Sequence, residues 1–219
     1  PTVSLMTSSH IIFGGLDKWV LLAIPFFVLA GNLMASGGTA KYLVELLDSL
    51  VGHLPGGLSI AAVLACMIFS ALSGSGPATT VAIGTIMVGP MVARGYDKKY
   101  SMGVIATTGT LGNVIPPSIA FIIVGSLTEM DVGRLFMAGL LPGIFIGLVI
   151  AVVAVFVARR TGYERKSAAS WRDRGRAFLK AIPALLMPLI ILGGIYSGMF
   201  TPTEAAAVAC VYALIASSI

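Results

Sequence analysis

The sequence contains few charged side chains and few residues that carry out chemistry. Only 11% of its 219 residues are charged, and there are two cysteines and two histidines. Cys66 and Cys210 lie in separate apolar segments, and their spacing predicts neither a disulfide nor a metal site. No His, Asp, Glu or Lys lies within the predicted membrane spans to activate a hydroxyl or thiol nucleophile, so we do not expect an enzyme.

Charge is absent from long windows of the chain, and this absence excludes an ordinary soluble domain. The sequence is 57% hydrophobic and its mean hydropathy is +0.98, as in polytopic membrane proteins. Each window reaches or nearly reaches the roughly 20 apolar residues that a spanning helix needs, and the longest has room for two passes. Windows without Asp, Glu, Lys or Arg include 19–40, 49–93, 100–128, 135–158, 181–203 and 205–219.

The basic residues that are present gather in one part of the sequence. Eight of the 14 lysines and arginines lie in 159–180, which predicts a loop between spans rather than a nucleic-acid surface. Counting crossings places this loop and the basic segment 94–99 on one side of the membrane, with the acidic residues of 129–131 on the other. The positive-inside rule makes the basic side cytoplasmic.

The apolar pattern predicts an all-α polytopic membrane protein. Residues 18–35 are typical of a spanning helix with a kink near Pro25. In residues 39–52 the apolar residues recur at helical spacing. This predicts an amphipathic helix that either lies along the interface or packs on a partner. The chain has no initiator Met and stops within an apolar stretch, so we expect it to be part of a longer membrane protein.

Two stretches of Gly, Pro and hydroxyl residues interrupt the predicted helices at membrane depth. "SGSGP", 73–77, divides a hairpin over 54–94, and "GNVIPP", 112–117, interrupts a crossing over 100–128. A regular helix cannot run through two consecutive prolines, which lack the backbone donor. Non-helical chain at this depth must be buried in protein or line a cavity. An ordinary extracellular turn between two full spans is the alternative for 73–77.

Each interruption joins the end of one half-helix to the start of another. Carbonyl groups near Ser73 and Gly112 carry partial negative charge and suit a small cation. N–H groups near Ala78 and Ser118 suit an anion. Discontinuous helices whose ends point at the midplane are the usual architecture of secondary-transporter sites.

Two predicted helix starts have clear capping signals. Pro77 suits the first position of a helix, with Ser75 or Gly76 as its cap. "TPTE", 201–204, has the pattern of a capping box, and this explains Glu204 better than a proton relay does. Residues 132–158 and 181–200 are predicted crossings on either side of the basic loop.

Five segments together resemble the large membrane subunit of the tripartite ATP-independent periplasmic (TRAP) transporters. They are "LAIPFFVLAGNLM", "SALSGSGPATTVAIGTIMVGPMVARGYD", "TLGNVIPPSIAFIIVG", "FMAGLLPGI" and "GMFTPTEAAAVACVYAL". The resemblance implies an elevator-type transporter built from inverted repeats, in a bacterial inner membrane. The units it implies are 1–53, a scaffold helix with an amphipathic interfacial arm; 54–128, the first half of the transport domain; 129–200, scaffold helices with the basic cytoplasmic loop 159–180; and 201–219, the start of a second repeat.

The resemblance also implies a site and its ligands. Na+ as the coupling ion would be held mostly by backbone carbonyls, and a substrate carboxylate would face the half-helix N-termini. Family members often have Pro at the position of Asn113 and a small hydrophobic residue at that of Pro77. The expected Na+ residues are Ser73, Gly74, Ser75, Thr110, Gly112, Val114 and Pro116. The expected substrate residues are Pro77, Ala78, Thr79, Thr80, Asn113 and Ser118.

From this resemblance we expect a sodium-coupled importer of small organic acids such as dicarboxylates or sialic acid. The implied partners are a small membrane subunit, a periplasmic substrate-binding protein, the organic acid and membrane lipid, with no nucleic acid. Two alternatives remain open. One is an ion-coupled carboxylate carrier that needs no binding protein, and the other is a structural membrane subunit that transports nothing.

Overall fold

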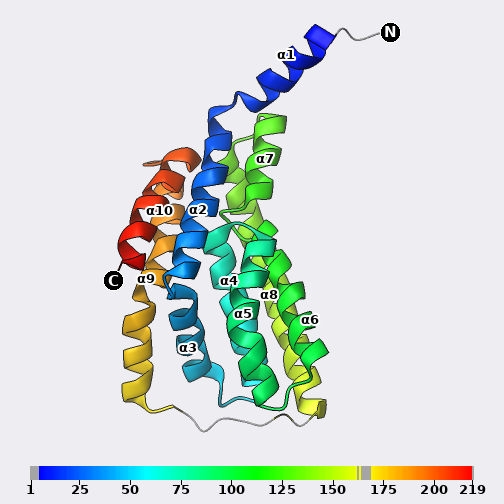
Figure 1. Cartoon of the computed structure of the whole chain (residues 1–219), viewed down its shortest axis with the longest axis vertical. Coiled ribbons are helices and arrows are strands. Elements are labelled where there is room, and N and C mark those ends of the chain that lie inside the picture. Colours follow the sequence, from blue (N-terminus) through cyan, green and yellow to red (C-terminus); the bar gives the residue numbers. More distant parts are fainter. Residues whose placement is uncertain (1–4, 162, 164–168, 219) are drawn as a thin grey trace.

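The computed structural model describes residues 5–161, 163 and 169–218, and over these residues every regular element is a helix (Figure 1). The elements are α1 (Leu5–Leu16), the 3-10 turn η1 (Trp19–Leu22), α2 (Ala23–Ser36), α3 (Thr39–Val51), α4 (Gly57–Ser73), α5 (Gly76–Ala93), α6 (Lys98–Gly109), the 3-10 turn η2 (Thr110–Asn113), α7 (Ile119–Thr128), α8 (Val132–Thr161), α9 (Trp171–Tyr196) and α10 (Pro202–Ser217).

Four helical segments in the described part of the chain are long and apolar enough to cross a membrane. They are Trp19–Ser36, Gly76–Ala93, Val132–Thr161 and Trp171–Tyr196. The predicted all-α polytopic membrane protein is therefore confirmed.

Helix α4 forms the centre of the bundle because it is apolar or small around its whole circumference. Ala61, Ala65, Cys66 and Phe69 are all buried, and α4 packs against α2, α3, α5, α6, α8 and α9. A helix that is hydrophobic all round belongs in an interior. Helix α8 differs, since Leu141 on it is 79% exposed, as expected of a surface that faces lipid.

The predicted hairpin and interrupted helix are both present. Helices α4 and α5 form the hairpin, and the next crossing is broken between Gly109, where α6 ends, and Ile119, where α7 begins. The hairpin tip lies near mid-height of the bundle, with α7 continuing beyond it (Figure 1). Ser73 at the tip is 1% exposed, so the alternative of an ordinary external turn at 73–77 is wrong.

The first span is irregular near Pro25. The 3-10 turn η1 runs directly into α2, which begins at Ala23, two residues before Pro25. The change of helix type therefore lies close to the position where the sequence predicts a kink. The prediction missed α1, which extends away from the bundle (Figure 1).

The amphipathic helix α3 packs inside the chain. Leu43 and Leu47 are buried, and the helix contacts α9 and α4. It stands upright beside them (Figure 1), so packing on neighbouring helices, rather than lying flat on the membrane surface, accounts for its apolar face.

The predicted loop 159–180 is helical at both ends. Helix α8 continues to Thr161, and α9 begins at Trp171, capped by the Ser170 hydroxyl, which accepts from Arg172 N. Arg, Lys and Ala favour helix, so charge alone does not mark a loop. Residues 162 and 164–168 lie outside the described part.

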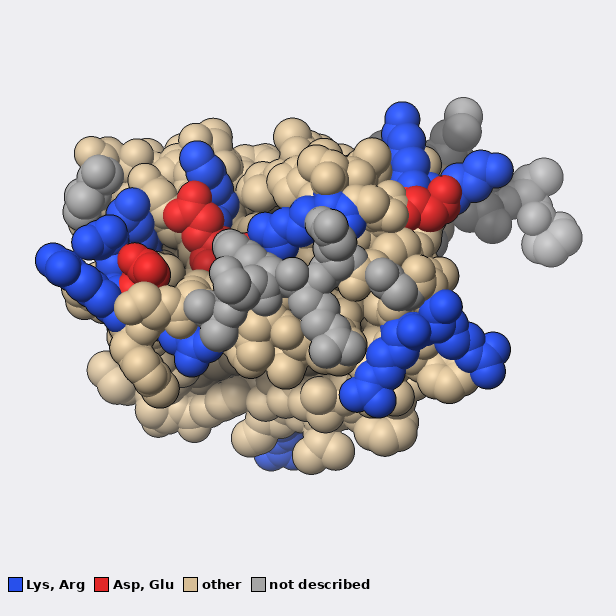
Figure 2. Space-filling model, turned by 90° about the horizontal axis from the view of Figure 1, so that it is seen from below, with Lys and Arg blue, Asp and Glu red and all other residues tan. Residues whose placement is uncertain are grey.

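Basic side chains gather at the end of the molecule where α5 and α8 end and α9 begins (Figure 2). There the Arg94 guanidinium donates two hydrogen bonds to the Asp48 carboxylate, at 3.0 and 3.1 Å. This bond raises the pKa of Arg94 and holds the end of α3 against the end of α5. The predicted segregation of charge is thus present in the fold.

Candidate functional site

The two helix breaks lie in direct contact. The carbonyl of Gly74 accepts a hydrogen bond from Ile119 N at 3.1 Å, so the end of α4 is joined to the start of α7. Gly76 N donates to the Asn113 side-chain oxygen at 3.4 Å. We call this arrangement of residues 73–80 and 109–119 the joint. Backbone that would otherwise be unpaired at this depth is satisfied across the joint.

Glycine is required where the breaks touch. A Cβ on Gly112 would lie 2.6 Å from the Gly76 nitrogen, and one on Gly74 would lie 2.7 Å from the Pro117 carbonyl oxygen. Gly74 also has φ +61°, which disfavours any side chain. Each obstacle is backbone, which has little freedom to move aside. The glycines therefore set how closely the half-helices approach.

Two further glycines, which the sequence reasoning missed, allow close contacts at the joint, one from α2 outside it and one at the end of α6 within it. A Cβ on Gly31 of α2 would lie 2.9 Å from Ser73 Cα, and one on Gly109 of α6 would lie 1.9 Å from Thr80 Oγ1. Gly31 belongs to the "LAGNLM" segment, and its small size was the available signal. It is the point where α2 meets the tip of the hairpin.

Hydroxyl groups in the interior of the joint bond to one another. Ser73 Oγ lies 2.9 Å from Thr79 Oγ1 and 3.2 Å from the Ser75 carbonyl oxygen. Ser118 Oγ donates to the Asn113 carbonyl at 2.7 Å. Ser73, Thr79 and Ser118 are buried. These hydroxyls position the backbone of the breaks from inside.

The predicted Na+ residues are brought together only in part. The backbones of Ser75 and Gly112 are in contact, and Thr110 Cα lies near Gly76. The Thr110 hydroxyl, however, is turned to its own helix and donates to the Thr107 carbonyl at 2.7 Å. The carbonyl oxygen of Val114 faces Gly139 of α8, which belongs to neither break. Of the remaining residues, Ser73, Gly74 and Pro116 are buried.

The predicted substrate residues divide into a buried and an accessible group. Thr79 and Ser118 are buried and bonded as described. Pro77 and Asn113 are exposed, and Ala78 and Thr80 are half-buried. The Thr80 hydroxyl donates to the Gly76 carbonyl at 3.0 Å. The accessible face of the joint is therefore the one around Pro77 and Asn113.

Helix α5 starts one residue earlier than predicted. Ser75 is the cap and its hydroxyl accepts from Ala78 N at 3.5 Å, so Gly76 is the first helical residue and Pro77 the second. The second position of a helix also lacks an intrahelical N–H partner, so proline is tolerated there. The peptide dipoles of this turn give the site its positive end, although Gly76 N and Ala78 N already donate to Asn113 Oδ1 and Ser75 Oγ.

The electrostatics of the joint come from peptide dipoles. No Asp, Glu, Lys or Arg occurs in 49–93 or 100–128, and the described residues contain no group of three His, Cys, Asp or Glu that could hold a metal. Helix ends supply about half an elementary charge each. The polar groups of the joint are therefore peptide groups, an amide and hydroxyls rather than ionised side chains.

Fold and joint define a class: a multi-pass α-helical membrane protein whose helices break against each other at mid-height. The chain belongs to the DctM component family of the tripartite ATP-independent periplasmic transporters, whose family model matches residues 2–219. The resemblance seen in the sequence is thus confirmed.

Relatives with assigned names are transporter permeases rather than enzymes. The C4-dicarboxylate TRAP transporter large permease protein DctM of Pseudomonas aeruginosa is 50% identical over 196 residues, which are 90% of this chain and 46% of that protein. The 2,3-diketo-L-gulonate TRAP transporter large permease protein YiaN of Escherichia coli is 44% identical over 94% of this chain and 48% of its own length. The sialic acid TRAP transporter large permease protein SiaM of Vibrio cholerae is 39% identical over 92% of this chain and 47% of its own length. The chain spans about half the length of these relatives.

Proposed function

We propose that this chain forms part of a sodium-coupled secondary transporter that imports small organic acids delivered by a periplasmic binding protein. The observation that carries the proposal is the joint, where two half-helix ends and two half-helix starts meet within the bundle. Relatives named for C4-dicarboxylates, a diketogulonate and sialic acid support a carboxylate substrate. A small membrane subunit would be the second partner, and the bacterial inner membrane the location.

The proposed Na+ site is the contact between the Ser73–Ser75 backbone and Gly112. Carbonyl oxygens are suitable ligands for a hard cation and need no ionised side chain. Because the two breaks touch there, one ion would bind both at once. Binding of Na+ would favour the arrangement in which the starts of α5 and α7 face the position of the substrate carboxylate.

The proposed carboxylate position lies at the start of α5, on the accessible face around Pro77 and Asn113. The N–H groups of the first turn have a partial positive charge and no carboxylate of their own. An ion that stabilises this arrangement raises the affinity for the acid, and by reciprocity the acid raises the affinity for the ion. The binding of Na+ and of the acid would be coupled because both ligands contact the backbone of the same two breaks.

Reconstitution tests the proposal. The full-length transporter with its small subunit and binding protein is placed in liposomes, and uptake of a labelled C4-dicarboxylate and of sialic acid is measured. We expect uptake with an inward Na+ gradient and at least a tenfold loss when K+ replaces Na+. Equal uptake in both conditions would contradict sodium coupling. Equal uptake without the binding protein would instead favour the independent carrier.

A structural, non-transporting subunit is tested with the joint itself. We expect the double variant Ser73→Ala plus Ser75→Ala to lose transport while the assembly with the small subunit stays intact. Unchanged uptake by this variant would remove the joint from the mechanism.

A further inference from the structure

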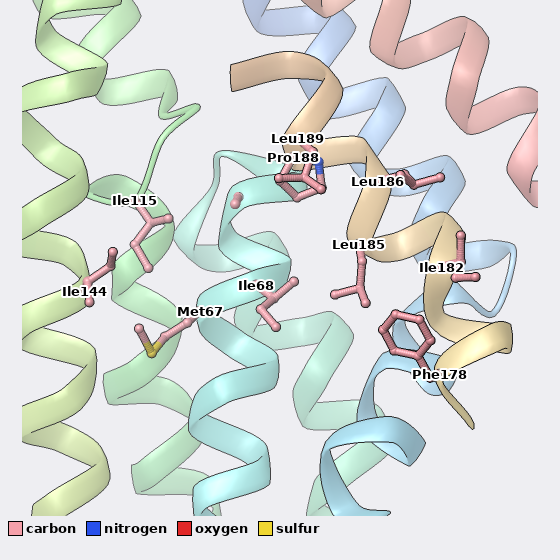
Figure 3. Close-up of a pocket in the computed structure, with 11 residues that line it drawn as sticks. Met67, Ile68, Ile115, Ile144, Phe178, Ile182, Leu185, Leu186, Pro188 and Leu189 are labelled. Atoms are coloured by element: carbon pink, nitrogen blue, oxygen red, sulfur yellow. The ribbon is translucent and has the colours of Figure 1, made fainter. Parts of the chain in front are cut away.

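An apolar groove of about 580 Å³ lies between α4 and α9, with Ile115 of the joint and Ile144 of α8 also in its lining (Figure 3). Met67 and Ile68 of α4 form one wall, and Phe178, Ile182 and Leu185 of α9 form the other. All the residues that line it are apolar. Its outer edge is open, since Phe178 is 51% exposed. An open apolar groove on a helix long enough to span a membrane suits an acyl chain.

The groove has the length of one membrane leaflet. From Phe178 to Leu189, the two ends of the α9 wall, the helix rises about 17 Å at 1.5 Å per residue. This is roughly half of the ~30 Å hydrocarbon core. A single acyl chain extending from one surface toward the midplane matches this depth.

A cation and an aromatic ring stand at the basic end of the groove. Arg174 and Trp171 precede Phe178 by four and seven residues, a spacing that places all three on one face of α9. The guanidinium carbon of Arg174 lies 5.2 Å from the centre of the Trp171 ring. Trp171 is 84% exposed, as expected of a tryptophan at the membrane–water interface.

Arg174 has unused hydrogen-bonding capacity. Its Nε is buried and has no hydrogen-bond partner among the residues that the structure describes. The arginine fork suits a phosphate, which can accept two N–H groups at once. Other basic residues collect at the same end of the molecule (Figure 2), so the potential there favours a negative headgroup.

We propose that this groove is a binding site for an anionic phospholipid, with one acyl chain along α9 and the phosphate at Arg174. The acyl chain replaces mobile bilayer lipid in the groove, and the charged headgroup selects the lipid. This proposal does not depend on sodium coupling or on the identity of the transported acid.

Native mass spectrometry of the full-length protein tests it, with phosphatidylglycerol and phosphatidylethanolamine as probes. We expect the wild type to retain phosphatidylglycerol in preference, and Arg174→Ala to retain at least threefold less. Arg176→Ala is the matched control. It removes the same charge, and Arg176 lies on the opposite side of α9 from Arg174. Equal losses in the two arginine variants would reduce the effect to general surface charge and overturn the proposal.

The acyl chain is tested separately by filling the groove. Ile182→Trp is expected to lower phosphatidylglycerol retention at least threefold, whereas Leu141→Trp on the exposed face of α8 is expected to leave it unchanged. Ile182→Phe, a smaller filler, serves if the Trp variant lowers the thermal midpoint. Unchanged lipid retention with loss of another polypeptide from the complex would show that a protein helix fills the groove. Displacement of the lipid by inorganic phosphate alone would show that the acyl chain contributes nothing.

Discussion

Helices α5 and α10 begin with nearly the same capping sequence, but only the start of α10 has a carboxylate of its own. Ser75 caps α5 and Thr201 caps α10, and each is followed within two residues by a proline. At the third helical position α5 has Ala78, whereas α10 has Glu204, whose carboxylate accepts from Thr201 N at 2.8 Å. The start of α10 is therefore closed by its own acid.

The start of α5 has a neutral amide in place of that acid. Gly76 N donates to the Asn113 oxygen across the joint at 3.4 Å, a long and weak hydrogen bond. A helix start that lacks its own carboxylate keeps a positive end available for an external anion. The comparison teaches that one residue separates a purely structural helix start from a candidate binding site.

The largest expected effect comes from forcing the joint apart with Gly112→Ala. The added Cβ would lie 2.6 Å from backbone at Gly76, and overpacking of this kind costs about 1–3 kcal/mol. We expect uptake to fall at least tenfold and the thermal midpoint to drop. The control is Gly103→Ala, where a Cβ meets nothing within 4 Å. Matching behaviour of the two variants would mean that the close approach is irrelevant.

Giving α5 the acid of α10 should close the proposed anion site. In Ala78→Glu the new carboxylate sits at the third helical position after Ser75, completing a capping box. We expect organic-acid uptake to fall about tenfold, because the new carboxylate repels the carboxylate of the substrate. Ala78→Gln keeps the shape without the charge, and should retain most of the activity. Comparable uptake by the Glu and Gln variants would argue against a carboxylate at this helix start.

Removing the N-cap of α10 should lower the stability of the protein without changing transport. Thr201→Ala removes the cap, and loss of an N-cap costs about 1 kcal/mol. We expect a lower midpoint in thermal unfolding and an unchanged dependence of uptake on Na+. Thr201→Ser keeps the hydroxyl and should behave as the wild type. A changed sodium dependence in the Ala variant would tie α10 to the site.

The smallest expected effect is a pH dependence at the same cap. Hydrogen bonds from the Thr201 backbone and hydroxyl lower the pKa of Glu204 below its ordinary value. A lowered pKa contributes stability above the ordinary carboxylate range of about 4.3, and this is lost as pH falls through the pKa of the folded state. The midpoints of the wild type and Glu204→Gln should therefore differ at pH 7 and converge at lower pH. A constant difference down to pH 3 would contradict this.

Much of the fold could be predicted because the bilayer imposes strict rules on sequence. The hairpin, the interrupted crossing and the 201–204 capping box follow from charge-free windows, consecutive prolines and a short capping pattern. The start of α9 was missed because basic residues are compatible with both a loop and a helix. Helix α1 was missed because its 12 residues are too few for a span and include Ser, Thr and Gly, which favour helix weakly.

The candidate site was predictable in position but not in detail. The breaks could be recognised by Gly and Pro, yet the direction of each group could not. Thr110 and Val114 are near the joint in sequence, whereas their hydroxyl and carbonyl turn to Thr107 and toward Gly139. Gly31 comes to the hairpin tip from a helix some 40 positions earlier. Such contacts depend on how separate helices pack.

The sequence by itself determined that this chain spans a membrane, where its helices stop, and which end is basic, because apolar length and charge follow from composition along the chain. Only the tertiary structure decided that the two interruptions hydrogen-bond to each other and that α4 and α9 leave an apolar groove between them. The hydrogen bond from Ile119 N to the Gly74 carbonyl joins residues 45 apart in the sequence. Such a bond, like the gap between two helices, depends on distances in space, which local pattern does not encode.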